Sequence, residues 1–405
     1  MPYMDGGSAV LSEKTLQKDD SNPSIGEEIK KVRVHSFAQK PILVFWETTK
    51  ACMLACRHCR ASAIHSALPG ELTTEEGLDL IDKITEFGAP YPVIVFTGGD
   101  PLMRKDIFEL MARAKKLGIK FAVSPAVTSM LTYDNMVKMR DLGATSISIS
   151  LDGAVKETHD SIRSIDGTFN ATIESIKNAL DVGLNIQINT TVMKSNVNEL
   201  PRIFNLIKSL GVKVWEVFFL IKIGRGAELE EISPSEYESV CNFLYDASKY
   251  GVVIRTVEAP FERRVANMRT KLGFYWKDPF YNRLHSELVD LEGEPQYNST
   301  ISPVGTLDGD GIIFVGNDGT IFPGGFLPIK LGNVRTDNIV EIYRSNIVMT
   351  SIRAREFSGY CGKCEFKWQC GGSRARTYYA ERNLLASDPA CFYPMIIGGE
   401  ETVKR

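Results

Sequence analysis

The sequence lacks several features that would place it in a familiar functional class. Its formal net charge is only −3, so it has no excess of basic residues of the kind that binds nucleic acid. It has no apolar run approaching the roughly 20 residues that a membrane-spanning helix needs. Its first residues lack the basic stretch followed by an apolar one that marks a secretory signal. We therefore expect a cytoplasmic protein with neither a membrane span nor a nucleic-acid partner.

The composition is that of a folded protein. Hydrophobic residues make up 43% of the 405 residues and charged residues 24%, as in globular proteins. The chain is too long for one ordinary domain of about 100–150 residues, and a barrel-sized domain with a smaller one attached fits its length. Residues 1–38 are polar and have no hydrophobic period, so we expect a flexible N-terminal arm there.

From residue 39 to residue 255, short β-branched or aromatic stretches alternate with amphipathic ones. We expect strands at 42–46, 93–96, 119–124, 145–151, 184–192 and 212–220. We expect helices at 74–87, 104–117, 132–142, 168–182, 197–210 and 234–250. Such α/β alternation predicts right-handed βαβ units and a parallel sheet, with the ligand site at the carboxyl ends of the strands. The period by itself does not decide between an open doubly wound sheet and a partial barrel.

The pattern changes in the last third of the chain. Residues 256–300 are rich in basic and aromatic residues without a clear period, which indicates a linker or a lid. Further on, the stretches 311–315 and 320–322 flank Asn-Asp-Gly at 317–319 and predict a β-hairpin whose turn needs positive φ. A cysteine-rich segment follows, so we expect residues 301–405 to form a small C-terminal domain.

Seven of the eight cysteines fall into two groups. The first group is Cys52, Cys56 and Cys59, and the second is Cys361, Cys364, Cys370 and Cys391. In a reducing compartment, cysteine groups of this kind indicate metal ligands rather than disulfides. Cys241 stands alone in an expected helix, where it is predicted to be a small buried apolar residue.

The first group follows the first expected strand and offers three thiolates. Three thiolates leave one iron of a [4Fe–4S] cluster without a protein ligand, so that a substrate or cofactor could bind there. The alternative is a structural zinc site completed by His58 or by a distant residue. Structural zinc sites supply four ligands, and His58, placed between Cys56 and Cys59, would be a strained one. The spacing therefore favours the iron–sulfur cluster.

The stretch CMLACRHC at 52–59 resembles the CxxxCxxC signature of radical S-adenosylmethionine (SAM) enzymes. This resemblance implies a partial (β/α)6 TIM-type barrel, consistent with the six expected strand–helix units. It also implies that SAM binds the open iron of the cluster. Cleavage of SAM would then yield a 5′-deoxyadenosyl radical that abstracts a hydrogen atom from the substrate.

Other motifs extend the resemblance to SAM contacts. Thr-Gly-Gly-Asp-Pro at 97–101 resembles the GGE motif that meets the SAM amino group, which assigns Gly98, Gly99 and Asp100, with Asp in place of the usual Glu. Glycine lets the backbone approach a ligand closely, although a plain strand-to-helix turn is the alternative. The stretch 148–153 is similar to the segment that contacts the SAM ribose and carboxylate, with Ser150 the first candidate and Asp152 the second.

Three polar side chains are further candidates on weaker grounds. Arg163, in an HDxxR run, could pair with the SAM carboxylate, and a surface ion pair with Asp160 or Asp166 is the alternative. Gln187 and Asn189 lie on one face of the fifth expected strand, where they could reach adenosine or substrate. No side chain is assigned a catalytic role.

The second cysteine group supplies four thiolates, which closes a metal site and points to a structural or electron-transferring role. On spacing alone, zinc and [4Fe–4S] fit about equally. The segment from Cys361 to Cys391 resembles the SPASM/twitch extension of some radical SAM enzymes. This implies one auxiliary [4Fe–4S] cluster bound by Cys361, Cys364, Cys370 and Cys391, since the upstream cysteines of a full SPASM domain are missing. Ser373 stands where several relatives have cysteine.

The strongest resemblance is to the branch of the family that modifies tetrapyrroles in heme and heme d1 biosynthesis. It implies an enzyme that removes or oxidises propionate side chains and takes electrons from a donor such as ferredoxin or flavodoxin. Five cations could clamp substrate carboxylates: Arg225, Arg263, Arg264, Arg374 and Arg376. For Arg374 and Arg376, packing beside the second cysteine group is the alternative.

Two other functions remain open. One is a maturase that modifies a ribosomally made peptide or another cofactor. The other is a non-catalytic iron–sulfur or zinc scaffold, which the SAM-contact motifs disfavour because a scaffold needs no SAM pocket.

Overall fold

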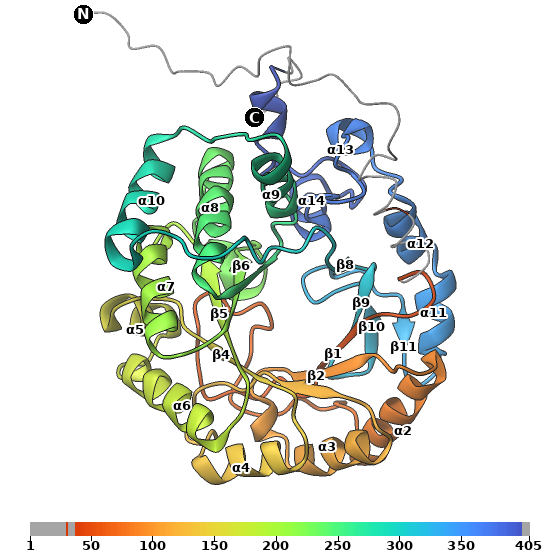
Figure 1. Cartoon of the computed structure of the whole chain (residues 1–405). Helices are drawn as coiled ribbons and strands as arrows, with labels where there is room; N and C mark the ends of the chain where they lie inside the picture. Colours follow the sequence, from red (N-terminus) through yellow and green to blue (C-terminus); the bar gives the residue numbers. More distant parts are fainter. Residues whose placement is uncertain (1–29, 31–36, 399–405) are drawn as a thin grey trace, which may run out of the picture.

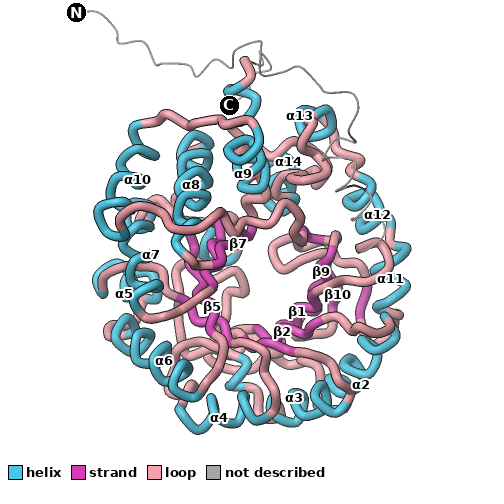
Figure 2. The backbone as a smooth tube through the Cα atoms, in the orientation of Figure 1, coloured by secondary structure: helices cyan, strands magenta, loops and turns pink. Residues whose placement is uncertain are grey.

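The computed structural model describes residue 30 and residues 37–398. The expected N-terminal arm, 1–38, lies almost entirely outside the described residues. The described chain forms an α/β fold around one curved, mostly parallel sheet, with helices around the outside of it (Figure 1). The strands run in the order β11-β10-β9-β1-β2-β3-β4-β5-β6-β7, and β8 pairs with β9. Figure 2 shows these strands as an inner layer inside the ring of helices.

Seven successive strands pair in parallel with their neighbours. They are β1 (Leu43–Glu47), β2 (Val93–Thr97), β3 (Phe121–Val123), β4 (Ile147–Ser150), β5 (Ile186–Val192), β6 (Val214–Phe219) and β7 (Val253–Val257). Six of them confirm the strands expected from the sequence, whereas β7 was not predicted. The structure thus shows a curved sheet of the partial-barrel type and not an open doubly wound sheet.

Six of the helices between these strands confirm the expected alternation. They are α2 (Thr74–Ile84), α3 (Ile107–Lys116), α4 (Tyr133–Asp141), α6 (Thr168–Val182), α7 (Leu200–Ser209) and α8 (Pro234–Ala247). A seventh, α5 (Lys156–Arg163), was not predicted from the sequence. Local sequence explains several of their ends. Helix α8 begins with a capping box in which Ser233 and Glu236 satisfy each other's backbone N–H groups. Helix α6 ends at Gly183, which has a φ of 86° that glycine adopts without steric cost.

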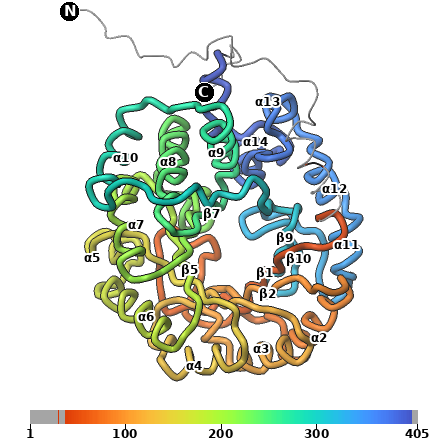
Figure 3. Tube along the Cα trace, viewed as in Figure 1, coloured from red at the N-terminus to blue at the C-terminus, as the bar shows by residue number. Residues whose placement is uncertain are grey.

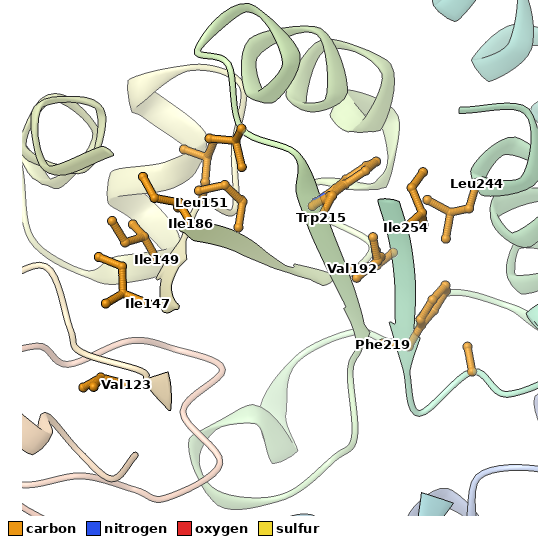
Figure 4. Close-up of a cluster of buried hydrophobic side chains, with 14 of the residues drawn as sticks. Val123, Ile147, Ile149, Leu151, Ile186, Val192, Trp215, Phe219, Leu244 and Ile254 are labelled. Atoms are coloured by element: carbon orange, nitrogen blue, oxygen red, sulfur yellow. The ribbon is translucent and has the colours of Figure 1, made fainter. Parts of the chain in front are cut away.

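The main core lies between the sheet and the helices. Alternate residues of β5 are buried, so Ile186, Ile188 and Val192 face the helices while Gln187 and Asn189 face the barrel interior. Trp215 of β6 is fully buried in the same layer, and its indole N–H donates to Thr190 Oγ1 over 2.9 Å. Figure 4 shows this layer of aliphatic and aromatic side chains. Each buried large side chain contributes about 1.5–3 kcal/mol, which holds the strands in register.

The C-terminal part continues the same sheet. Strands β8 (Leu307–Asp308), β9 (Gly311–Val315), β10 (Thr320–Phe322) and β11 (Gly332–Asn333) belong to it. The expected hairpin is confirmed, because β10 is antiparallel to β9 and Gly319 in the turn has a φ of 79°. The sequence did not predict that β9 pairs in parallel with β1, in the register Leu43↔Ile312. Figure 3 shows these two strands, from opposite ends of the chain, side by side.

The remaining helices cover the end of the sheet and carry the second cysteine group. They are α9 (Glu262–Lys271), α10 (Pro279–Glu292), α11 (Ile339–Ser345), α12 (Ile347–Ala354), α13 (Gly359–Lys363), α14 (Arg374–Glu381) and α15 (Tyr393–Ile396). The stretch 256–300, expected as a linker or lid, contains α9 and α10, which its aperiodic sequence did not predict. Helix α10 packs against α7 and α8 and fully buries Tyr281, Leu284 and Leu288. Within the described residues, no helix has the length and apolar character needed to cross a membrane.

Candidate active site

The first cysteine group lies in a loop that leaves the carboxyl end of β1. Cys52 and Cys56 are buried and Cys59 is half-buried. The Leu54 N–H donates to Cys52 Sγ over 3.3 Å, and the Ala63 N–H is 3.5 Å from Cys59 Sγ. Backbone donors of this kind favour the thiolate form, which is the form that binds metal. Burial raises the pKa of Cys52 to about 11, so its deprotonation requires positive charge nearby.

A buried network of charged side chains connects this loop to the end of β4. Asp152, after the end of β4, is fully buried, and its Oδ2 lies 2.9 Å from His58 Nε2 and 2.5 Å from Arg163 Nη2. Its Oδ1 accepts from the Thr191 N–H over 2.8 Å. The Arg163 guanidinium, the neighbouring His58 and the hydrogen bonds hold the pKa of Asp152 well below its usual range, against the opposing effect of burial. Asp152 therefore carries a full negative charge that fixes His58 inside the cysteine loop.

Arg163 connects this network to a sulfur atom. Its Nη1 donates to Cys56 Sγ over 3.5 Å, while its Nη2 pairs with Asp152. The alternative of a surface ion pair with Asp160 is wrong, because Asp160 instead accepts from the backbone N–H groups of Gly167 and Phe169 at the start of α6. Arg163 is a buried residue that lends positive charge to the cysteine loop.

The Gly98-Gly99-Asp100 motif follows β2 and lies against the same loop. The Gly99 N–H donates to Thr49 O over 2.8 Å, and the Asp100 N–H donates to Ala51 O over 2.7 Å. A Cβ atom at Gly98 would lie 2.6 Å from Thr49 O, and one at Gly99 would lie 2.3 Å from Ala51 O. Both glycines are therefore required by the close approach of two backbone segments, whatever ligand the motif meets.

Asp100 has partners within the protein. It is fully buried, and its carboxylate accepts from Thr128 Oγ1 over 2.9 Å and from the Leu102 N–H over 3.1 Å. Burial raises its pKa despite these hydrogen bonds. The hydrogen bond from Thr128 to Asp100 thus connects the loop after β2 to the loop after β3.

Two residues that brace the cysteine loop were not recognised as such from the sequence. Glu71 Oε1 accepts from the Lys50 N–H over 2.7 Å and from Thr49 Oγ1 over 3.1 Å. Arg225, expected as a clamp for substrate carboxylates, instead donates through Nε to Cys56 O over 2.8 Å and through Nη1 to Ala63 O over 2.7 Å. The strand ends thus converge on the cysteine loop, as expected for a site at the carboxyl edge of a parallel sheet.

Polar side chains line one side of the barrel interior. The strand register places Ser150, Asn189, Glu216 and Arg255 in one row across β4, β5, β6 and β7. Gln187 Nε2 donates to Glu216 Oε2 over 2.8 Å and to Asn189 Oδ1 over 2.9 Å. Burial raises the pKa of Glu216, which Arg255 and Gln187 only partly offset. Sequence reasoning had selected Ser150, Gln187 and Asn189 but missed Glu216 and Arg255.

Aromatic rings and one cation lie near the first cysteine loop and the C-terminal strands. Arg60, next to Cys59, places its guanidinium 4.7 Å from the centre of the Phe314 ring of β9. It also donates to Glu47 Oε2 over 2.7 Å and to Gly325 O over 3.0 Å. The rings of Phe218, on β6, and Phe326 lie 6.3 Å apart between centres. These contacts join the first cysteine loop to the C-terminal strands.

The second cysteine group begins with Cys361 in α13, and its other three members lie between α13 and α15. Cys370 is buried, and Cys361, Cys364 and Cys391 are half-buried. The Asp388 N–H lies 3.5 Å from Cys361 Sγ, and the Gly372 N–H lies 3.4 Å from Cys370 Sγ. Burial raises the pKa of Cys370 to about 12, to which the neighbouring Cys361 and Cys364 add. As in the first group, buried thiols and backbone donors to sulfur provide the ligand chemistry of an iron–sulfur cluster.

The remaining four arginines expected as substrate clamps have protein partners. Arg374 lies 3.8 Å from Cys361 Sγ and donates to Leu384 O and Ala386 O, so it packs beside the cysteines. Arg376 pairs with Glu231 at 2.5 Å, and Arg264 pairs with Glu238. Arg263 is buried and donates to Thr306 O over 3.2 Å. Their use as carboxylate clamps is not supported, because burial and internal pairing remove them from the barrel interior.

Ser373 does not take a ligand position. Its hydroxyl donates to Glu258 and accepts from the Arg376 N–H over 2.9 Å as the N-cap of α14. Among the residues that the structure describes, no three His, Cys, Asp or Glu side chains come together closely enough to hold a single metal ion.

Comparisons with known sequences agree with this geometry. Residues 46–207 match the model of the radical SAM superfamily. The chain is 36% identical over 358 residues to the AdoMet-dependent heme synthase of Oleidesulfovibrio alaskensis, with 87% of each chain covered. It is 30% identical to the Fe-coproporphyrin III synthase of Methanosarcina barkeri, covering 91% of this chain and 92% of the relative. It is 28% identical to the mycofactocin maturase MftC of Mycobacterium ulcerans, covering 87% and 88%.

Solved structures share the fold. SuiB of Streptococcus suis bound to S-adenosylmethionine superposes with a TM-score of 0.63 at 12% identity, covering 89% of this chain and 79% of SuiB. Native anSMEcpe with bound AdoMet and a peptide gives a TM-score of 0.63 at 17% identity, covering 89% and 99%.

Proposed function

This chain belongs to the radical SAM superfamily, and from that membership we propose that it modifies a tetrapyrrole by removing or oxidising propionate side chains. It is an enzyme that uses SAM and a [4Fe–4S] cluster, as members of this family do. The observation that carries the proposal is the identity of 30–36% to a heme synthase and an Fe-coproporphyrin III synthase over about nine-tenths of the chain. Relatives of this similarity commonly share a reaction type, although a fold alone does not define a substrate.

The site residues support this assignment. Cys52, Cys56 and Cys59 are the ligands we propose for the cluster, because they are three thiols with backbone donors beside a buried arginine. Once bound there, the cluster and SAM supply a 5′-deoxyadenosyl radical that abstracts a hydrogen atom from the substrate. The chain's own contribution is to hold the cysteine loop against the strand ends and to position the substrate in the barrel.

The residues that contact SAM remain proposals. Gly98 and Gly99 present backbone next to the cysteine loop, and Ser150 points into the barrel near it. Hydrogen bonds and ion pairs within the protein already engage the side chains of Asp100, Asp152 and Arg163. We therefore propose that these residues position the SAM site and do not make its main contacts.

We also propose that Cys361, Cys364, Cys370 and Cys391 bind one auxiliary [4Fe–4S] cluster. Buried thiols with backbone donors to sulfur support it, and so does Arg374, which lies beside Cys361. Four thiolates leave no open position, which suits a structural or electron-transferring role. A reductant such as ferredoxin or flavodoxin would supply the electron for SAM cleavage.

Product analysis tests the tetrapyrrole proposal. The anaerobically reconstituted enzyme is incubated with SAM, dithionite and iron-coproporphyrin III, and the porphyrin is analysed by mass spectrometry. We expect loss of carboxyl groups together with 5′-deoxyadenosine. Cleavage of SAM without any change in the porphyrin would overturn the substrate assignment while leaving the enzyme class intact.

A peptide maturase is the second candidate, favoured by the 28% identity to mycofactocin maturase MftC. Incubation with a short peptide encoded beside this gene distinguishes the two candidates. A mass change of the peptide, with the porphyrin unchanged, would decide for the maturase.

A further inference from the structure

One row of polar side chains crosses the barrel interior, and two of its members, Glu216 and Arg255, were not expected from the sequence to contact a ligand. Ser150 pairs with Asn189, Asn189 with Glu216, and Glu216 with Arg255 in the strand register. Side chains at paired positions of neighbouring parallel strands lie on the same face of a sheet. Ile254, next to Arg255, is buried against the helices beside Leu244 (Figure 4), so Arg255 faces the interior.

Arg255 differs from the arginines first expected to bind substrate. Arg264, Arg374 and Arg376 are all buried and hydrogen-bonded to protein groups. Arg255 is exposed, and it makes no hydrogen bond or ion pair with any residue that the structure describes. Its guanidinium therefore retains donors that can hydrogen-bond a ligand inside the barrel.

Arg255 keeps its hydrogen-bond donors although a carboxylate lies beside it in the row. Glu216 Oε2 accepts from Gln187 Nε2 over 2.8 Å. Gln187 Nε2 also donates to Asn189 Oδ1 over 2.9 Å, so both of its N–H groups are used, whereas the Asn189 amide N–H groups have no partner among the described residues. This side of the barrel thus presents one guanidinium and the amide N–H groups of Asn189, next to Glu216.

Aromatic rings lie beside this polar row. Phe218 lies one inward-facing position beyond Glu216 on β6, and the centre of its ring is 6.3 Å from that of Phe326. Phe314, on β9, lies under the guanidinium of Arg60. A ligand that contacts both Arg255 and these rings therefore combines a flat apolar body with an anionic edge.

We propose that Arg255, with the Asn189 amide beside it, binds a carboxylate of the substrate inside the barrel. A guanidinium binds a carboxylate through two parallel hydrogen bonds, which fixes its orientation as well as its position. This inference rests on the proposed tetrapyrrole function and assigns the residues that would recognise a propionate group. Arg255 would then select carboxylated macrocycles over their esters.

The test compares two ligands in the full reconstituted enzyme. Iron-coproporphyrin III and its tetramethyl ester are titrated anaerobically, and their Kd values are obtained from the porphyrin absorbance. We expect the acid to bind wild type at least tenfold more tightly than the ester. In Arg255→Gln the affinity for the acid should fall about tenfold and the affinity for the ester should change little, whereas Arg255→Lys should keep part of the preference.

Controls separate this role from a structural one and from a contact with SAM. Arg202→Gln, on the outer surface of α7, removes the same charge from an exposed ion pair with Glu287 and should leave both Kd values unchanged. An equal loss of affinity for acid and ester in Arg255→Gln would indicate a structural role and overturn the inference. A weaker Kd for SAM with unchanged porphyrin binding would assign the carboxylate to SAM and also overturn it.

The outcomes also distinguish this inference from the proposed function. If wild type binds neither porphyrin, the tetrapyrrole function fails and the inference fails with it. If wild type prefers the acid and Arg255→Gln keeps that preference in full, the inference alone is wrong.

Discussion

His58 and Asp152 form the contact that holds the first cysteine loop to the barrel, with 2.9 Å between His58 Nε2 and Asp152 Oδ2. His58 stands between two of the cysteines, and Asp152 follows the fourth strand, so the contact joins segments 94 residues apart. Because Asp152 also pairs with Arg163, which donates to Cys56, one carboxylate positions both a ring and a cation around the thiols.

Replacing Asp152 with Asn should therefore release the cysteine loop. Removing one partner of a buried ion pair costs about 3–5 kcal/mol, because the other partner stays buried without compensation. We expect the iron bound at the first cysteine group and the formation of 5′-deoxyadenosine to fall at least tenfold, measured by iron analysis and chromatography. Asp160→Asn, which weakens only the start of α6, is the matched control and should keep both close to wild type.

Gly99→Ala should disrupt the loop by steric conflict. The new Cβ would lie 2.3 Å from Ala51 O, and hydrogen bonds between the two backbone segments prevent them from moving apart. We expect the variant to fold with the second cysteine group intact and to lose iron at the first. In Gly183→Ala the Cβ meets open space, so that variant should cost only about 1 kcal/mol for its left-handed backbone and retain iron at both groups.

The two cysteine groups should bind their iron–sulfur clusters independently of each other. With one four-iron cluster at each, the reconstituted chain should hold about eight irons, and Cys56→Ala or Cys370→Ala should each lower this to about four. Cys56→Ala should also abolish SAM cleavage. Cys241→Ala is the control, since Cys241 is fully buried in α8 and belongs to neither group of expected ligands. A wild-type iron content near four would assign the second group to a different metal.

Glu262 should make stability depend on pH. Burial raises its pKa from 4.5 to about 7, and its Oε1 is buried without a hydrogen-bond partner among the described residues. A raised pKa in the folded state means that stability is greatest below about 4.5 and is lost as the pH rises through about 7. A shift of this size corresponds to about 3 kcal/mol.

Thermal unfolding between pH 6 and pH 8.5 checks this expectation. The Tm of wild type should fall as the pH rises, whereas Glu262→Gln should unfold at a higher temperature at pH 8.5 and depend less on pH. Equal pH dependence in the two proteins would contradict the role of Glu262.

Much of the architecture could be predicted from local sequence. The strand–helix alternation follows from hydrophobic period, and the helix ends at Ser233 and Gly183 follow from capping and backbone preferences that act within a few residues. The signatures of the cysteines and of Gly98-Gly99 could also be read directly, because each lies within one short segment. The helices of 256–300 were missed, since burial against α7 and α8 stabilises them and their own sequence shows little period.

The sequence by itself determined which residues carry cofactor chemistry, because thiols, paired glycines and their spacing are local properties. Only the tertiary structure decided which charges are free to meet a substrate. Hydrogen bonds and ion pairs within the protein occupy the guanidinium groups of Arg225, Arg264, Arg374 and Arg376. Arg255, in contrast, faces the barrel interior with Glu216 beside it. That difference depends on strand register and on contacts between distant segments, and local sequence does not encode either of them.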